Sequence, residues 1–215
     1  MVWYGTVEGM PSRNVVKIDI ADSFYHVYGR GHSRQEIFLD DEDYGTFLNL
    51  LKRYLSRERQ QDRLGALYPH LYDHIELLCF CLMPNHFHLL VYQREAGMMT
   101  VLMRGVMTSY SRYFNKKYVR SGSVFESRYK AAMILDQSYL EHISRYIHLN
   151  PKNWQSFPYS SIDFYLGKRQ AEWLRTTRIL ELFNSPEDYR QFVSDYQSHK
   201  QTLDIIKRDL ADTTF

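Results

Sequence analysis

Two histidines spaced two positions apart, His86 and His88, are the residues of this sequence best placed to bind a metal. They lie in the apolar run His86–Tyr92, which predicts a β-strand. Because successive strand side chains alternate between faces, both imidazoles point the same way and Phe87 points toward the core. Two histidines and one oxygen ligand hold a divalent metal and leave positions open for substrate and water. The pair alone also fits two unrelated strand histidines, one packed and one solvated.

The sequence contains 18 tyrosines, and a tyrosine can pack, stack on a base or act as a nucleophile. A nucleophile has to lie on a rigid element that reaches the metal, preferably beside a third ligand. Residues i and i+4 share one face of a helix, and among Tyr110, Tyr113, Tyr118, Tyr139 and Tyr146 only Tyr146 has a candidate ligand there. That residue is Asn150, whose amide oxygen suits a hard cation. Position alone also fits a packing role for Tyr146.

A sheet and helices have to position these residues, and the sequence predicts both. Strands are expected where aromatic, β-branched or apolar residues run together: Ser23–Arg30, Ile75–Met83, His86–Tyr92 and Tyr129–Ile134. Helices are expected after the acidic run Asp40–Asp43, over Met98–Tyr118, over about Gln137–Leu149 before Pro151, and around Thr177–Phe183 and Ser185–Tyr196. The order β-α-β-β-α-β-α predicts an α+β fold in which helices cover a sheet, with a C-terminal helical extension.

The length and composition are those of an ordinary globular chain. A length of 215 residues allows one domain, or one domain with an appendage, and 44% hydrophobic residues exclude a wholly disordered protein. Cys79 and Cys81 form neither a disulfide framework nor a C-x-x-C metal or redox pair. We see no signal peptide and no apolar run near the roughly 18 residues of a membrane span, and therefore expect a cytoplasmic protein.

A net charge of only +2 hides a basic block. The stretch from Arg104 to Lys130 holds seven basic residues and a single acid, Glu126. Such a block beside tyrosines suits contact with the phosphates of a nucleic acid, and the alternative is a solvated helix face. The candidates for backbone contacts are Arg112, Lys116, Lys117, Arg120, Arg128 and Lys130.

Four blocks of the sequence resemble the single-tyrosine HUH transposases, specifically the REP-associated tyrosine transposases. The segment 84–90 (P-N-H-F-H-L-L) resembles the His-hydrophobic-His motif of that group. The segment 24–31 resembles its opening strand, and 122–130 resembles its G-x-x-aromatic-Glu/Gln-x-R-aromatic-K block. The segment 139–151, which ends in Y-I-H-L-N-P, resembles its tyrosine helix. The resemblance spans about residues 15–158, and four blocks in the right order make it far more specific than H-x-H alone.

The resemblance implies a ferredoxin-like (RRM-like) antiparallel sheet and places the catalytic tyrosine of the family on Tyr146. It implies that His86, His88 and Asn150 hold Mg²⁺ or Mn²⁺, since relatives carry Asn or Gln at the third position. The implied activity is metal-dependent cleavage and transfer of single-stranded DNA near a hairpin, through a 5′-phosphotyrosine. We expect the catalytic domain over residues 1–155 and a helical extension over residues 156–215. This tail goes beyond the minimal catalytic domain and could bind DNA, mediate dimerisation or cap the fold.

Two other functions stay open. One is a metal-dependent hydrolase that uses His86 and His88 with water as the nucleophile, and the other is a catalytically silent nucleic-acid-binding relative. The intact histidine pair, Tyr146 and Asn150 argue against the silent relative. Some relatives share active sites across a homodimer and others are self-contained, so a homodimer is one of two expected states. His26 lies on the first predicted strand, where it could approach DNA.

Overall fold

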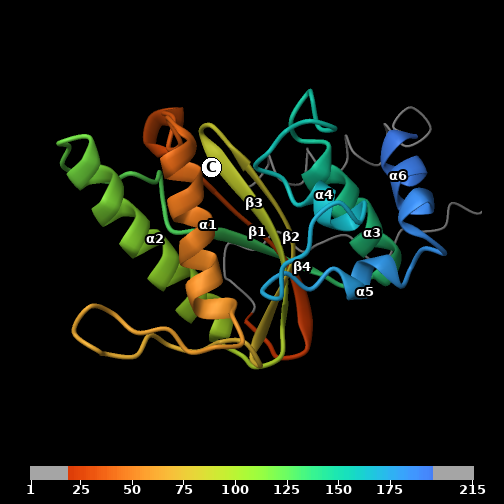
Figure 1. Cartoon of the computed structure of the whole chain (residues 1–215), viewed down its shortest axis with the longest axis horizontal. Helices are drawn as coiled ribbons and strands as arrows, with labels where there is room; N and C mark the ends of the chain where they lie inside the picture. The colour runs from red at the N-terminus through yellow and green to blue at the C-terminus, as the bar shows by residue number, and fades with distance from the viewer. Residues whose placement is uncertain (1–18, 196–215) are drawn as a thin grey trace, which may run out of the picture.

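The computed structural model describes residues 19–195 of the chain. In this range four strands form one antiparallel sheet in the order β2-β3-β1-β4 (Figure 1). The strands are β1 (Ser23–Arg30), β2 (Ile75–Met83), β3 (His86–Gln93) and β4 (Lys130–Ile134). One helix lies between β1 and β2 and another between β3 and β4, which gives the ferredoxin-like order β-α-β-β-α-β. The predicted α+β fold with an antiparallel sheet is confirmed.

Two helices, α1 (Asp41–Leu55) and α2 (Met98–Lys117), cover one face of the sheet (Figure 1). Helix α1 begins where the acidic run predicts, because the Asp40 carboxylate accepts the backbone N–H of Asp43 at 3.1 Å and caps the first turn. The core under these helices is built from buried apolar side chains of β1, β3, α1 and α2. A short 3-10 helix, η1 (His32–Arg34), follows β1.

The remaining helices lie on the opposite side of the sheet (Figure 1). They are α3 (Gln137–His148), α4 (Ile162–Tyr165), α5 (Thr177–Leu180) and α6 (Pro186–Ser194). Helix α3 packs against β2, β3 and β4, and α5 and α6 pack against α3. A second cluster of buried apolar side chains joins these helices to the sheet. Residues 196–215 of the expected extension, with the last residue of the helix predicted over Ser185–Tyr196, lie outside the described residues.

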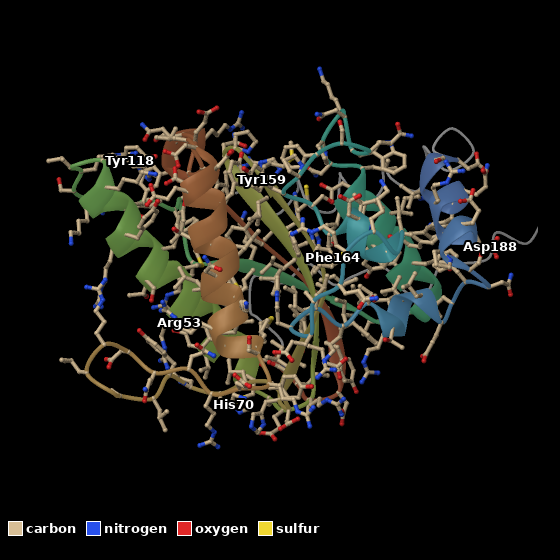
Figure 2. The ribbon with its side chains drawn as sticks, viewed as in Figure 1. Arg53, His70, Tyr118, Tyr159, Phe164 and Asp188 are labelled. Carbon is tan, nitrogen blue, oxygen red and sulfur yellow. The ribbon has the colours of Figure 1, made fainter. Side chains whose placement is uncertain are left out.

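The segment between α3 and α4 ties the C-terminal helices to the rest of the fold. The Tyr159 ring stacks on the Tyr44 ring of α1 with centroids 3.7 Å apart, so this segment reaches across to α1 (Figure 2). The Ser161 hydroxyl accepts the backbone N–H of Phe80 in β2 at 2.9 Å. Both contacts lie at the end of this segment next to α4, and they anchor it to α1 and β2.

Cys79 and Cys81 are unpaired and buried in β2, as two small apolar strand residues would be. No helix in residues 19–195 is both long and apolar enough to cross a membrane.

Candidate active site

Strand β3 presents His86 and His88 on the face of the sheet that α3 covers. The strand starts directly after a two-residue turn, and Phe87 points to the opposite face, where it is fully buried against Phe47 at a ring-centroid distance of 5.2 Å. A side-chain carbon at Gly29 would lie 2.7 Å from the Phe87 ring, so only glycine lets this ring sit against β1. The alternation predicted from H-x-H is the one observed.

His86 lies between two side-chain amides. Its Nδ1 is 2.6 Å from Asn85 Oδ1, and its Nε2 is 3.1 Å from Asn150 Oδ1. Asn85 donates its amide N–H to the Arg34 carbonyl at 3.3 Å, which orients its oxygen toward the imidazole. The second contact joins the H-x-H strand to Asn150, which lies two residues after the end of the tyrosine helix α3.

Tyr146 of α3 lies over the same face, edge-on to two imidazoles. Its ring centroid is 5.5 Å from that of His88 and 5.9 Å from that of His26. Burial raises the pKa of Tyr146 to about 12, while a hydrogen bond with the Asn150 side chain and the nearby Arg30 guanidinium act in the opposite direction. The four predicted residues His86, His88, Tyr146 and Asn150 therefore meet in one place, and all come from one chain.

The donor set fits a divalent metal. Burial lowers the pKa of His86 and places that of His88 well below its usual range, so both imidazoles are neutral near pH 7, the form that binds metals. A neutral imidazole has one N–H, yet both nitrogens of His86 face carbonyl oxygens. If Nδ1 donates to Asn85, the lone pair of Nε2 faces the lone pairs of Asn150 Oδ1, an arrangement that a cation between them would stabilise. Among residues 19–195 no three His, Cys, Asp or Glu side chains group into a metal site, so the amide of Asn150 would be the third ligand.

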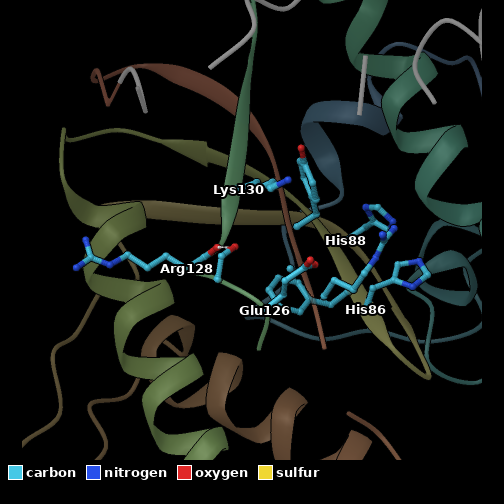
Figure 3. A pocket seen from close by; sticks show the side chains of 10 residues that line it. His86, His88, Glu126, Arg128 and Lys130 are labelled. Carbon is cyan, nitrogen blue, oxygen red and sulfur yellow. Dashed lines mark hydrogen bonds between the residues drawn. The ribbon is translucent and has the colours of Figure 1, made fainter. Parts of the chain in front are cut away.

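A basic cavity adjoins the histidines (Figure 3). It is lined by Tyr28, Gly29, Arg30, His86, Phe87, His88, Glu126, Ser127, Arg128 and Lys130. Three cations and one acid around this cavity favour an anionic group such as a phosphate. Of the predicted backbone contacts, Arg128 and Lys130 lie here, and the Arg128 side chain extends away from the histidines.

Arg30 is a site residue that the sequence patterns did not single out. In the sheet its Cα pairs with that of His86, so its position at the cavity follows from the register of β1 on β3. The Arg-Gly step of the opening-strand resemblance contains it, and this was the one signal available.

The other four predicted contacts lie apart from the histidines. Arg112, Lys116 and Lys117 belong to α2, which packs on the far face of the sheet, and Arg120 follows it. The Lys117 ammonium lies 2.7 Å from Asp40, 2.9 Å from Glu42 and 3.0 Å from Asp43. Arg120 donates to the Gln35 side chain at 2.9 Å. The ion pairs of Lys117 satisfy its charge within the protein, so the structure gives no support to its prediction as a backbone contact.

A sequence model of the family described as "Transposase IS200 like" matches residues 52–150, which include both histidines, Tyr146 and Asn150. The match covers slightly under half of the chain, and over this segment the chain is similar to the IS200-like transposases. The family agrees with the resemblance found in the sequence blocks. No curated protein matches the chain in a sequence search.

Two solved structures similar to the chain are also described as transposases. One is "Structure of the REP associates tyrosine transposase bound to a REP hairpin", with 14% sequence identity and a TM-score of 0.53 over 75% of this chain and 91% of that one. The other is a putative transposase from Deinococcus radiodurans R1, with 14% identity and a TM-score of 0.37 over 68% of this chain and 95% of that one. The first structure supports the fold described above for this chain.

Proposed function

We propose that this protein is a transposase that cleaves single-stranded DNA near a hairpin and forms a 5′-phosphotyrosine through Tyr146. The observation that carries the proposal is the convergence of Tyr146, His86, His88 and Asn150 on one face of the sheet, beside a basic cavity. A hairpin is the expected partner because the structurally similar REP-associated enzyme was solved with one. Single-stranded DNA lets the scissile phosphate rotate into line with the phenol, which a regular duplex does not.

The residues divide the work of an in-line displacement. The cavity cations Arg30 and Lys130 hold the phosphate and stabilise the charge that spreads over its oxygens. Tyr146 Oη attacks phosphorus, the bond from phosphorus to the 3′ oxygen breaks, the phenol proton is released to water, and the leaving oxygen takes up a proton as a 3′-OH. Attack by a 3′-OH on the phosphotyrosine reverses these bond changes and reseals or transfers the strand.

His86, His88 and Asn150 would hold Mg²⁺ or Mn²⁺ in this proposal. The metal supplies a Lewis acid that polarises a phosphate oxygen and favours the phenolate. Asn150 has a second function, because its side chain also bonds to Tyr146 and favours loss of the phenol proton. One amide thus connects the nucleophile to the ligand set.

The test is a covalent-adduct assay with Mn²⁺ and end-labelled hairpin DNA that carries single-stranded flanks. Wild-type protein should yield a denaturation-resistant protein–DNA species and a free 3′-OH, and Tyr146→Phe should yield neither. Tyr139→Phe, on the same helix, is the matched control and should retain the adduct. Cleavage that survives Tyr146→Phe would identify a hydrolase that uses water. Binding by the wild type without any adduct, across several hairpins, would identify a silent DNA-binding relative.

A further inference from the structure

We propose that His26 is a positioning residue that holds His88 in the tautomer able to bind a metal through Nε2, an inference that rests on the proposed function. His26 Nε2 lies 2.9 Å from His88 Nδ1, the distance of a hydrogen bond between the two rings. Both side chains are almost completely buried. Nothing in the motif H-x-H points to this third histidine, which comes from another strand.

The strand register fixes the two rings relative to each other. On β1, His26 pairs with Leu90 and Tyr28 pairs with His88, so the two histidines are diagonal neighbours on the face that α3 covers. The ring centroids of the two histidines are 5.0 Å apart, with an interplanar angle of 21°. The Tyr28 ring, two residues further along β1, stacks on the His26 ring with centroids 5.2 Å apart. Central strands hold this arrangement, so the contact does not depend on a flexible loop.

The direction of the shared hydrogen bond decides which nitrogen of His88 is available. A neutral imidazole has one donor and one acceptor nitrogen. If His88 Nδ1–H donates to His26 Nε2, the Nε2 lone pair of His88 is free for a metal; the reverse direction places a proton on that atom. His26 Nδ1 is buried and has no hydrogen-bond partner among the described residues, so no other contact fixes the tautomer of His26.

His86 and His88 are then oriented in the same way, because the Nδ1 atom of each ring faces a hydrogen-bond partner. His86 Nδ1 faces the Asn85 amide oxygen, and His88 Nδ1 faces His26 Nε2. With the shared hydrogen bond in the proposed direction, both Nδ1 atoms donate to an acceptor and both Nε2 lone pairs are left for the metal. Partners of this kind set ring orientation and basicity at metal sites, and their loss typically lowers metal affinity about 10–100-fold.

The test uses full-length wild type, His26→Phe, which keeps an aromatic ring but removes the acceptor, and His26→Gln, which keeps an acceptor. Titration with Mn²⁺ followed by electron paramagnetic resonance should show an affinity about 10–100-fold weaker for His26→Phe. The affinity of His26→Gln should return toward the wild-type value, and His32→Phe, at an exposed position, should leave it unchanged. Wild-type affinity in His26→Phe would overturn the proposal.

Nitrogen-15 NMR of the imidazoles in wild-type, metal-free protein gives an answer that needs no variant. We expect the His88 proton on Nδ1, and a proton on Nε2 would overturn the positioning role even if both His26 variants fail to fold. Failure of the proposed function has a different signature. In that case wild-type protein would bind Mn²⁺ and show the expected tautomer but form no adduct with hairpin DNA.

Discussion

The Nδ1 atom of His148 lies 2.7 Å from the hydroxyl of Tyr189, and this contact joins the tyrosine helix α3 to α6. The His148 ring is fully buried, and its Nε2 lies 2.7 Å from the Ser161 hydroxyl. The Tyr189 hydroxyl also lies 3.1 Å from Ser144 Oγ. The C-terminal helices therefore hold α3 from behind while Tyr146 faces the sheet.

We first predict that Tyr189→Phe destabilises the protein by about 1–3 kcal/mol, because it leaves a buried imidazole nitrogen without its partner. Urea denaturation followed by circular dichroism measures the change. Tyr72→Phe, which removes the hydroxyl of a half-buried tyrosine away from α3, is the matched control. Equal midpoints for the two variants would show that the His148–Tyr189 contact does not stabilise the fold.

The second prediction concerns Arg30, whose guanidinium lines the cavity and acts to lower the pKa of Tyr146. Arg30→Ala should slow single-turnover adduct formation about 10²–10³-fold, the usual cost of removing one group that stabilises transition-state charge. Arg30→Lys should recover part of the rate, since it retains the charge but not the planar fork. Arg34→Ala, in the exposed turn after β1, should react at the wild-type rate. A wild-type rate for Arg30→Ala would remove this residue from the mechanism.

The third prediction follows from the protonation state of Tyr146. Burial raises its pKa to about 12, so the phenol is protonated at neutral pH and the phenolate fraction grows about tenfold for each pH unit below that value. The rate of adduct formation should therefore increase with pH between 6.5 and 8.5 in single-turnover assays at saturating Mn²⁺. A flat profile over this range would show that loss of the phenol proton does not contribute to the rate.

The fourth prediction separates two lysines of the basic block. Lys130→Ala should weaken binding to single-stranded DNA and reduce the salt dependence by about one phosphate contact, because Lys130 lines the cavity. Lys117→Ala should leave binding unchanged and lower the melting temperature, because it removes the cation beside the buried Asp43 carboxylate. Fluorescence anisotropy at several salt concentrations measures binding. Weaker DNA binding by Lys117→Ala and unchanged binding by Lys130→Ala would place the DNA on the α2 side of the sheet.

The sequence was sufficient to predict the elements whose signal is local. Strands Ser23–Arg30 and Ile75–Met83 have the predicted limits, while the strand predicted from Tyr129 starts at Lys130 and the helix predicted to Leu149 ends at His148. These shifts are one residue at element ends, where pairing and capping decide the boundary. Only the family resemblance predicted that Tyr146 lies beside the histidines. Spacing along one helix does not specify which strands that helix covers.

The residues that escaped prediction depend on contacts between distant segments. His26 and Arg30 reach the site through the register of β1 on β3, and no local pattern specifies a register between strands about sixty residues apart. The ion pairs of Lys117 could not be predicted either, because its acidic partners lie more than seventy residues earlier in the chain. The helix Ile162–Tyr165 is a single turn, too short for a periodic signal.

The packing of α6 on α3 has a consequence during synthesis. Synthesis runs from the N-terminus, so a growing chain has the histidines and Tyr146 before it has the helix that holds α3 in place. Nascent or prematurely terminated chains should therefore be poor at nicking DNA. Under the proposed function, nuclease activity would arise only after translation has passed α6.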